Sequence, residues 1–583
     1  MTTSAAAAQP GPGVLRRLGP ALCVSLVLIG WSLIDTMVPG VNEPHYLCKA
    51  RHWFNPEWCS GDFFLESSNA HFVFYVVTGP LTELLPFAIV AVLGRVASLS
   101  LVATGWWLLS RRLGLSAISA VAAAAAFGCI ATAGNFSGEW VVGGFEGKVP
   151  AYGFCLLGSA LWIYAHGTVI GRKWVAAGAA LGAGVAFHPV VGLWYCIGIG
   201  LTEAILIAGA TFRGLRGADE QSISLARQWK TFGKQQLCLI AAAVVASLPG
   251  LIPAISLILN SPAAARDQRR ALYFQVFRRL AHHLDPSRFP LRNWIHTGLV
   301  VGLIGVGLWY VRKRCLADES IDRQLTKRTS SWQLSWRLMG TLLLVAAGIG
   351  LAGVLVGWHE GRASRLSDWH QRAAFLRYYP FRFVDGLLPM VGGMTAGLLL
   401  TIVSGGRARR ELVITMVLCT VLMGTAWSSR RTAPTGYTDA RFDEWKNACA
   451  WIQKNTLQDA VILGPREGFG LKWYAERAEY VCYKDCPQDA RGIVEWDRRL
   501  RLTGKWKWTR RIDSRYGDGG PVLRKDVLEL HRKTGATHIL TRRLREFEQD
   551  PVYRNRYWRV YDIRETNEER EALEVREAAE SAS

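Results

Sequence analysis

Residues 41–69 read VNEPHYLCKARHWFNPEWCSGDFFLESSN and form the first long polar stretch of the chain, directly after an apolar run at about 20–38. The stretch mixes charged side chains with aromatic residues of the kind that are enriched at membrane interfaces. The charged and aromatic residues include Glu43, His45, Tyr46, Lys49, Arg51, His52, Trp53, Phe54, Trp58, Asp62 and Glu66. We expect this stretch to be a loop just outside the membrane. If the protein carries out a reaction, we expect the reaction to take place there.

The apolar runs that surround this loop indicate a polytopic membrane protein. Hydrophobic residues make up 50% of 583 positions, and a membrane-spanning helix needs roughly 20 of them in a row. The first run lacks a small-residue cleavage site, so we interpret it as a retained anchor rather than a signal peptide. About 11 spans are predicted, at 20–38, 84–109, 115–134, 149–170, two short helices within 174–209, 237–260, 294–311, 334–357, 384–403 and 412–427.

The net charge of +22 comes largely from lysine and arginine at the ends of apolar runs. This placement favours anionic membrane lipid as a partner and gives no sign of nucleic-acid binding. Because positive charge in short loops marks the cytoplasmic side, we expect an integral protein of the inner (cytoplasmic) membrane with a cytoplasmic N-terminus.

The expected domain organisation follows from this orientation. After about residue 429 the long apolar runs end, and helical and strand-like segments alternate, which is typical of a small α/β domain. The predicted parts are a disordered cytoplasmic N-terminus (1–15), a transmembrane domain (16–428) with outer loops 39–83, 135–148, 261–293 and 358–383, an extracytoplasmic soluble α/β domain (429–565), and a charged tail (566–583).

Two outer loops carry more positive charge than the outer side normally has. They include Arg278, Arg279, His282 and His283 in the first and Arg377 and Arg382 in the second. Arginine suits phosphate because its planar fork donates two parallel hydrogen bonds. The alternative is a pair of solvated helices that touch anionic lipid, and the sequence leaves both open. A further outer loop supplies Glu139, Glu146 and Lys148.

The cysteines leave a similar choice open. Cys48 and Cys59 share the first loop, and Cys482 and Cys486 lie close together near the C-terminus. Either pair suits a disulfide in an oxidising compartment. No second pair or histidine completes a zinc site. A pair of carboxylates suits a divalent cation that shields phosphate charge, so such a cofactor is possible and its identity unknown.

The letters NEPHY at 42–46, KAR at 49–51 and GD at 61–62 resemble the loop after the first helix in GT-C-type glycosyltransferases that use lipid-phosphate donors, such as protein O-mannosyltransferases and aminoarabinose transferases. The chain is also similar to a bacterial multi-spanning membrane family of unknown function. The GT-C resemblance implies a GT-C-like helical fold and transfer of a sugar from a polyprenyl-phosphate donor to an extracytoplasmic acceptor, with inversion. Asn42 stands where that family usually has its first acid.

Because asparagine cannot act as a base, the resemblance gives that role to Glu43, with Asp62 orienting the acceptor or a metal. The substrate-binding candidates are Asn42, His45, Tyr46, Arg51, Glu139, Glu146, Lys148, Arg278, Arg279, His282, His283, Arg377 and Arg382. An alternative from another class is a non-catalytic membrane protein that binds lipid-linked glycans or scaffolds envelope partners. A transporter is disfavoured, because no inverted repeat is apparent and few charges lie at mid-membrane depth. No protein partner is predicted.

Overall fold

The computed structural model describes residues 14–571 except 69, 167–170, 216–220, 260–262, 406, 467, 506–521, 543–546 and 570. The N-terminus and the tail that were expected at 1–15 and 566–583 therefore fall largely outside the described residues.

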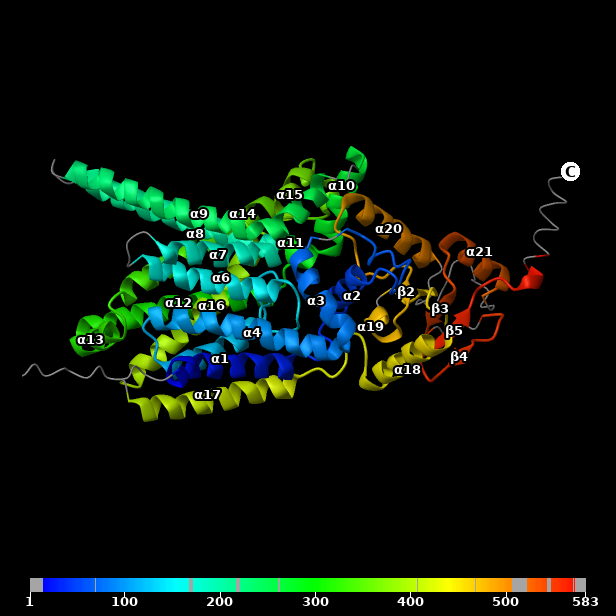
Figure 1. The fold of residues 1–583 in the computed structure, drawn as a ribbon, viewed down its shortest axis with the longest axis horizontal. Helices are drawn as coiled ribbons and strands as arrows, with labels where there is room; N and C mark the ends of the chain where they lie inside the picture. Colours follow the sequence, from blue (N-terminus) through cyan, green and yellow to red (C-terminus); the bar gives the residue numbers. More distant parts are fainter. Residues whose placement is uncertain are drawn as a thin grey trace, which may run out of the picture.

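Long helices lie side by side along the long axis of the molecule (Figure 1). Each predicted span corresponds to one of these helices. The chain breaks at His188 between α7 and α8, which agrees with the two short helices predicted within 174–209. They are α1 (Val14–Asp35), α4 (Phe87–Arg112), α5 (Ala117–Ala133), α6 (Lys148–Ala165), α7 (Arg172–Phe187), α8 (Pro189–Leu215), α9 (Gln221–Leu259), α12 (Leu291–Ala317), α14 (Trp332–Gly357), α16 (Phe381–Val403) and α17 (Ala408–Ser429).

Among the described residues, eight of these helices are long and apolar enough to cross a membrane, namely α1, α4, α8, α9, α12, α14, α16 and α17. The chain is thus an integral membrane protein, while the predicted count of eleven crossings is not confirmed. The helices differ in burial: 78% of the apolar window of α16 is buried against 11% for α17. Helix α16 therefore lies inside the bundle, and α17 presents most of its surface to lipid.

The first polar stretch is not simply a loop, which corrects the sequence-based expectation. Residues Glu43–Phe54 form helix α2, and α3 follows at Phe72–Leu84. Pro44 occupies the first turn of α2, where proline is tolerated because its missing N–H would have no partner in the helix. The apolar side of α2 packs on α3 and on Phe87 and Val90 of α4. This packing fixes the polar side of α2 relative to the bundle.

The C-terminal part confirms the expected alternation of helices and strands. Its elements are α18 (Asp439–Asn455), β1 (Val461–Leu463), α19 (Leu471–Ala475), β2 (Ala478–Glu479), α20 (Ala490–Lys505), α21 (Arg524–Thr534), β3 (His538–Thr541), β4 (Tyr553–Arg554) and β5 (Arg559–Asp562). The strands form one mixed sheet in the order β2-β1-β3-β5-β4. Strand β1 runs parallel to β2 and β3, with Ile462 opposite Glu479 and His538, and β5 is antiparallel to β3 and β4.

The sheet is covered on both faces because successive side chains of a strand point to opposite sides. Ile462 and Leu540 join the core formed with α18. Their neighbours Leu463 and Ile539 join the core formed with α20 and α21. The second core also includes Ala271 of the bundle's outer helix α10 (Ala265–Tyr273). The C-terminal domain is therefore packed against the bundle.

Short segments at one end of the bundle make this junction (Figure 1). Besides α2, α3 and α10 they are a π-helical turn at Phe274–Arg279, α11 (Ala281–Leu284), two 3-10 turns at Pro286–Arg288 and Ala363–Arg365, and α15 (Trp369–Leu376). Helix α13 (Glu319–Arg328) lies at the opposite end. The residues that the sequence singled out gather at the end that bears the C-terminal domain.

Candidate functional site: a polar junction between the bundle and the C-terminal domain

Glu43 lies at the N-terminus of α2 and is fully buried. Its Oε1 accepts hydrogen bonds from Arg95 Nε at 2.7 Å and from the Phe145 N–H at 2.6 Å. Its Oε2 accepts from Arg95 Nη2 at 2.9 Å and from the Gly40 N–H at 2.5 Å. Four donors thus surround the carboxylate, and Arg95 also donates to the Met37 carbonyl at 2.7 Å. This ion pair fastens the first loop and the second outer loop to α4.

Asp62 is equally buried and equally occupied. Its Oδ1 accepts from the N–H groups of Phe64 and Leu65 at 3.0 and 2.8 Å, and its Oδ2 accepts from the Glu479 N–H at 2.9 Å. The Lys472 ammonium lies 3.4 Å from the same oxygen. The catalytic roles expected for Glu43 and Asp62 stay predictions, and in this structure each carboxylate is held by four donors.

A second set of charged side chains is gathered from three outer segments. Lys148 Nζ lies 3.2 Å from Glu139 Oε1 and 2.9 Å from Glu146 Oε1. Arg382 Nε lies 2.8 Å from Glu139 Oε2. Asn42 Nδ2 donates to Glu146 Oε2 at 2.6 Å, so the first loop joins the same cluster. Because two carboxylates face two cations, this buried set balances its own charge.

Two histidines, His71 and His188, lie beside Arg382. His71 and His188 have ring centroids 4.7 Å apart, and Arg382 Nη1 approaches His188 Nε2 at 3.5 Å. Tyr46 Oη lies 3.5 Å from His71 Nε2. Burial, together with the positive charge of Arg382, lowers the pKa of His71 to about 3. His71 is therefore neutral at physiological pH and adds no positive charge to the cluster.

The backbone next to Arg382 adopts a conformation that bulky residues avoid. Tyr379 has a φ of 55°, and a non-glycine residue in this left-handed region costs of order 1–3 kcal/mol. The Arg382 guanidinium lies over the Tyr379 ring, 4.2 Å from its centroid. The strained turn thus sets the ring under the guanidinium and helps to aim Arg382 at Glu139.

Two further cations border the cluster from the side of the C-terminal domain. Arg279 Nη2 donates to the Lys484 carbonyl at 2.9 Å. Burial lowers the pKa of His45, and the charges of Lys484 and Arg279 lower it further against the opposing effect of Asp485. Glu146 and Lys148 lie within electrostatic reach of Lys484. Within the described residues neither Arg279 nor Lys484 has a carboxylate ion-pair partner, so both remain available to an anion.

The structure brings most of the predicted substrate-binding residues together and leaves some out. His283 joins through a 2.5 Å contact with the Ser137 carbonyl, and its ring lies 4.0 Å from that of His282. Arg278 instead pairs with Asp497 at 3.4 Å, Arg377 donates to Tyr378 Oη at 2.9 Å, and Arg51 pairs with Glu83 at 3.0 Å. The residues that gather are Asn42, His45, Tyr46, Glu139, Glu146, Lys148, Arg279, His282, His283 and Arg382.

Sequence reasoning missed several members of the junction. Arg95 had a usable signal, because a charged residue inside an apolar span is costly and needs a partner. His71, Lys472, Glu479, Lys484 and Asp485 had none, because each lies in an ordinary polar segment and meets the first loop only through the fold.

Lys472 is the centre of a buried acid cluster in the C-terminal domain. Its Nζ lies 2.6 Å from Asp485 Oδ2, 3.2 Å from Glu479 Oε2 and 3.4 Å from Asp62 Oδ2. Asp485 Oδ1 also contacts His45 Nδ1 at 2.8 Å. Burial alone would lower the pKa of Lys472, but the carboxylates outweigh it and raise that pKa well above its usual value. The cluster ties α2 to α19.

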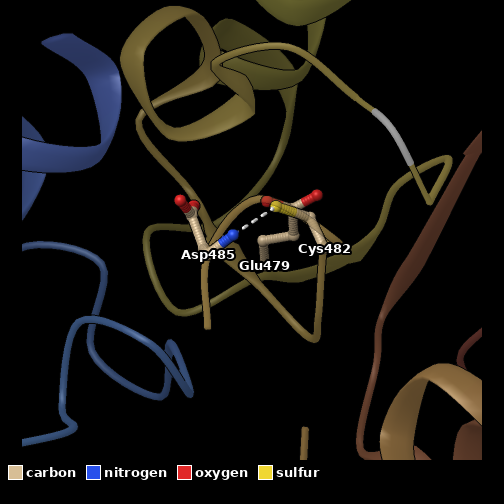
Figure 2. A group of neighbouring side chains, drawn as sticks. All are labelled: Glu479, Cys482 and Asp485. Carbon is tan, nitrogen blue, oxygen red and sulfur yellow. Dashed lines mark hydrogen bonds between the residues drawn. The ribbon is translucent and has the colours of Figure 1, made fainter. Parts of the chain in front are cut away.

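Two of these carboxylates, together with Cys482, form a candidate cation site. Glu479, Cys482 and Asp485 place one ligand atom each within 4.8 Å of one another, and the Asp485 N–H donates to Cys482 Sγ (Figure 2). Burial raises the pKa of the Cys482 thiol well above its usual value, whereas a metal ligand must be a thiolate. Because the Lys472 ammonium already lies within 3.2 Å of an oxygen of each carboxylate, it takes the place beside them that a divalent cation would need. All twelve cysteines are free, including the two pairs considered for disulfides.

Glu479 predicts a pH-dependent stability. Burial raises its pKa from 4.5 to about 7, although Lys472 opposes the shift. The folded state then binds more protons than the unfolded state between these values, so this contribution to stability is present below pH 4.5 and lost as pH rises through 7. Glu479→Gln should become more stable relative to wild type between pH 5 and 8, by on the order of a few kcal/mol. Thermal unfolding at each pH measures this, and a pH-independent difference would contradict it.

The fold and this junction define an integral membrane protein whose C-terminal α/β domain is docked on one end of its helical bundle. A family model described as a domain of unknown function (DUF6798) matches residues 443–503, within that domain. No curated protein matches the chain. Among 14 matching chains of solved structures is the Archaeoglobus fulgidus oligosaccharyltransferase, in a complex with zinc and sulfate, at 13% identity and a TM-score of 0.40, covering 89% of this chain and 67% of that one.

Proposed function

We propose that the protein is a GT-C-like membrane glycosyltransferase that moves a sugar from a polyprenyl-phosphate donor to an extracytoplasmic acceptor with inversion. The contact between Asn42 and Glu146 carries this proposal. The first loop resembles that of the GT-C enzymes but has Asn42 where they usually have an acid. Glu146 comes from the second outer loop and lies 2.6 Å from that asparagine. The carboxylate that the first loop lacks is thus supplied from another segment.

In this proposal Glu146 is the general base. Its carboxylate takes the proton of the acceptor hydroxyl while the hydroxyl oxygen attacks the anomeric carbon from the face opposite the phosphate. The bond between the anomeric carbon and the phosphate oxygen breaks, and its electron pair leaves with the phosphate. Attack from the opposite face inverts the anomeric configuration. Lys148 Nζ lies 2.9 Å from Glu146 Oε1 and holds the carboxylate in place.

The leaving phosphate gains charge in the transition state, and donors fixed in place stabilise it. Lys484 is suited to this role because it lies within electrostatic reach of Glu146, and Arg279 is suited to it because it contacts Lys484. Neither has a carboxylate ion-pair partner of its own in the described chain. The lipid tail would enter between helices at the bundle end that bears the C-terminal domain (Figure 1). The positive-inside distribution of the loops supports an extracytoplasmic position for that end.

Donor binding tests the phosphate site. Arg279→Ala and Lys484→Ala should each weaken binding of a labelled polyprenyl-phosphate sugar about tenfold or more, because a hydrogen bond to a charged group contributes roughly 1.5–3 kcal/mol. Binding is measured with the full-length protein in lipid nanodiscs. Arg377→Ala is the matched control, because its guanidinium donates to Tyr378 away from the cluster. Equal losses in all three variants, or none in the first two, would refute the site.

The charge balance of the cluster favours a second candidate, a non-catalytic protein that binds lipid-linked glycans. Glu139 and Glu146 both face Lys148, and Arg382 also faces Glu139, so the set resembles a structural network as much as a reactive one. This candidate shares the phosphate site, but no sugar is transferred. Donor binding without any labelled product, tested with a mixture of envelope acceptors, would favour it.

A further inference from the structure

A cavity of about 210 Å³ lies between the first loop and the C-terminal domain. Val41, Pro44 and His45 line it from the membrane part, and Pro434 and Thr435 from the linker. The C-terminal domain contributes the remainder of the wall: Gly468, Phe469, Gly470, Leu471, Lys472, Glu479, Cys482, Tyr483, Lys484 and Asp485. It shares Lys484 with the donor site proposed above, but neither Glu146 nor Arg279 lines it.

One residue of the wall has a buried oxygen that lacks the partner its burial demands. Glu479 is 3% exposed, and its Oε1 has no hydrogen-bond partner, while Oε2 faces Lys472. A buried acceptor without a partner is unfavourable, because it has lost its hydrogen bonds to water. A ligand in this cavity that donates a hydrogen bond to Glu479 would remove that cost. The unpartnered oxygen therefore points to a bound ligand and not only to a void.

The charges of the wall limit what the ligand can be. Lys472 already binds the carboxylates, which opposes a metal ion or an organic cation. The two wall cations, Lys472 and Lys484, are matched in number by the two wall carboxylates, Glu479 and Asp485, so the wall has no excess positive charge that would favour an anion. Burial keeps His45 neutral by lowering its pKa. A neutral molecule with hydroxyl donors is the remaining class.

The rest of the wall suits the apolar face of the same molecule. Phe469, Tyr483, Pro44 and Pro434 supply apolar and aromatic surface opposite the polar groups. Sites of this mixed kind bind ligands through apolar contact and a few placed hydrogen bonds. We propose that the cavity binds a neutral, hydroxyl-rich ligand of about one sugar ring, with Glu479 accepting from a hydroxyl. The proposal goes beyond the glycosyl-transfer proposal and does not depend on it.

Protection from chemical modification tests the site. The full-length protein in detergent is treated at pH 6.5 with a hydrophobic carbodiimide, which modifies protonated carboxyl groups, and labelling is located by mass spectrometry. Methyl α-glucopyranoside should slow labelling of Glu479 several-fold and leave that of exposed Asp443 unchanged. Inorganic phosphate and choline at the same concentration should have no effect. Unchanged labelling with the glucoside, or protection by phosphate or choline, would overturn the proposal.

A thermal measurement provides a second test that does not need Glu479 to react. Methyl α-glucopyranoside should raise the unfolding temperature of the wild type, and Val41→Trp should abolish the rise by filling the cavity. Val41 lines the cavity with a side chain that is 60% exposed, so the larger ring does not disturb a packed core. Val552→Trp is the matched control, because Val552 is also exposed and lies outside the cavity. No rise in the wild type, or an equal rise in Val41→Trp, would overturn the proposal.

Discussion

Glu146→Gln is expected to slow sugar transfer by about 10²–10⁴-fold, the usual contribution of a general base. Glutamine has nearly the same shape and keeps an oxygen for the Asn42 amide, so the fold and donor binding should be retained. A loss in the rate of the bound complex without a loss of donor affinity is the signature of a group that acts only in the transition state. Single-turnover transfer from a labelled polyprenyl-phosphate sugar separates these quantities.

Glu139→Gln is the matched control for this experiment. Glu139 shares Lys148 with Glu146, but it faces Arg382 instead of Asn42. Its loss should reduce transfer much less than the loss of Glu146. Full transfer by Glu146→Gln would exclude Glu146 as the general base. Equal losses in both variants would mean that the cluster as a whole is structural.

Arg95→Ala is expected to have the largest effect on stability. It leaves the Glu43 carboxylate buried without its ion-pair partner, and breaking a buried pair in this way costs about 3–5 kcal/mol. Both side chains are fully buried and joined by two hydrogen bonds. The variant should unfold at lower temperature, which is measured on the purified protein in detergent with a fluorescence melt.

The double variant Arg95→Met with Glu43→Met shows whether the loss comes from the unpaired charge. Replacing a buried pair by apolar side chains of similar volume is often neutral or even stabilising. The double variant should therefore recover much of the stability that Arg95→Ala loses. A double variant as unstable as Arg95→Ala would instead show that the hydrogen bonds to Gly40 and Phe145 are what the loop needs. A stable Glu43→Gln that cannot transfer sugar would return the catalytic role to Glu43.

The sequence predicted the helices of the bundle well, because the length of apolar runs is a local property. Each run, such as 384–403, corresponds to an observed helix, and the alternation in the C-terminal part predicted a small α/β domain, where the structure has one mixed sheet flanked by helices. The wrong prediction concerned α2. Its polar and aromatic residues suggested a loop, whereas packing on α3 and α4 makes it a helix.

The site was predicted only as a set of candidates. The sequence indicated that Glu146 and Arg382 matter, but not that Glu146 would lie against Asn42 or that Arg382 would face Glu139. Glu43 was expected to be the base because the first loop resembles that of GT-C-type enzymes. Its partner Arg95 lies in another apolar run, and the sequence did not indicate that the two residues would pair. Pairings of this kind are set by tertiary structure, which residue spacing along one chain does not encode.

The docking of the first loop on the C-terminal domain has a consequence for biosynthesis. His45 contacts Asp485 and Asp62 contacts Glu479 across 440 and 417 residues of sequence. Translation proceeds at roughly 5–20 residues per second, so these groups emerge tens of seconds before their partners. During that interval the first loop has its links to α4 but not those to the domain. Completion of the junction is thus a late event, and a ribosome stalled before residue 470 leaves the first loop without its partners in the C-terminal domain.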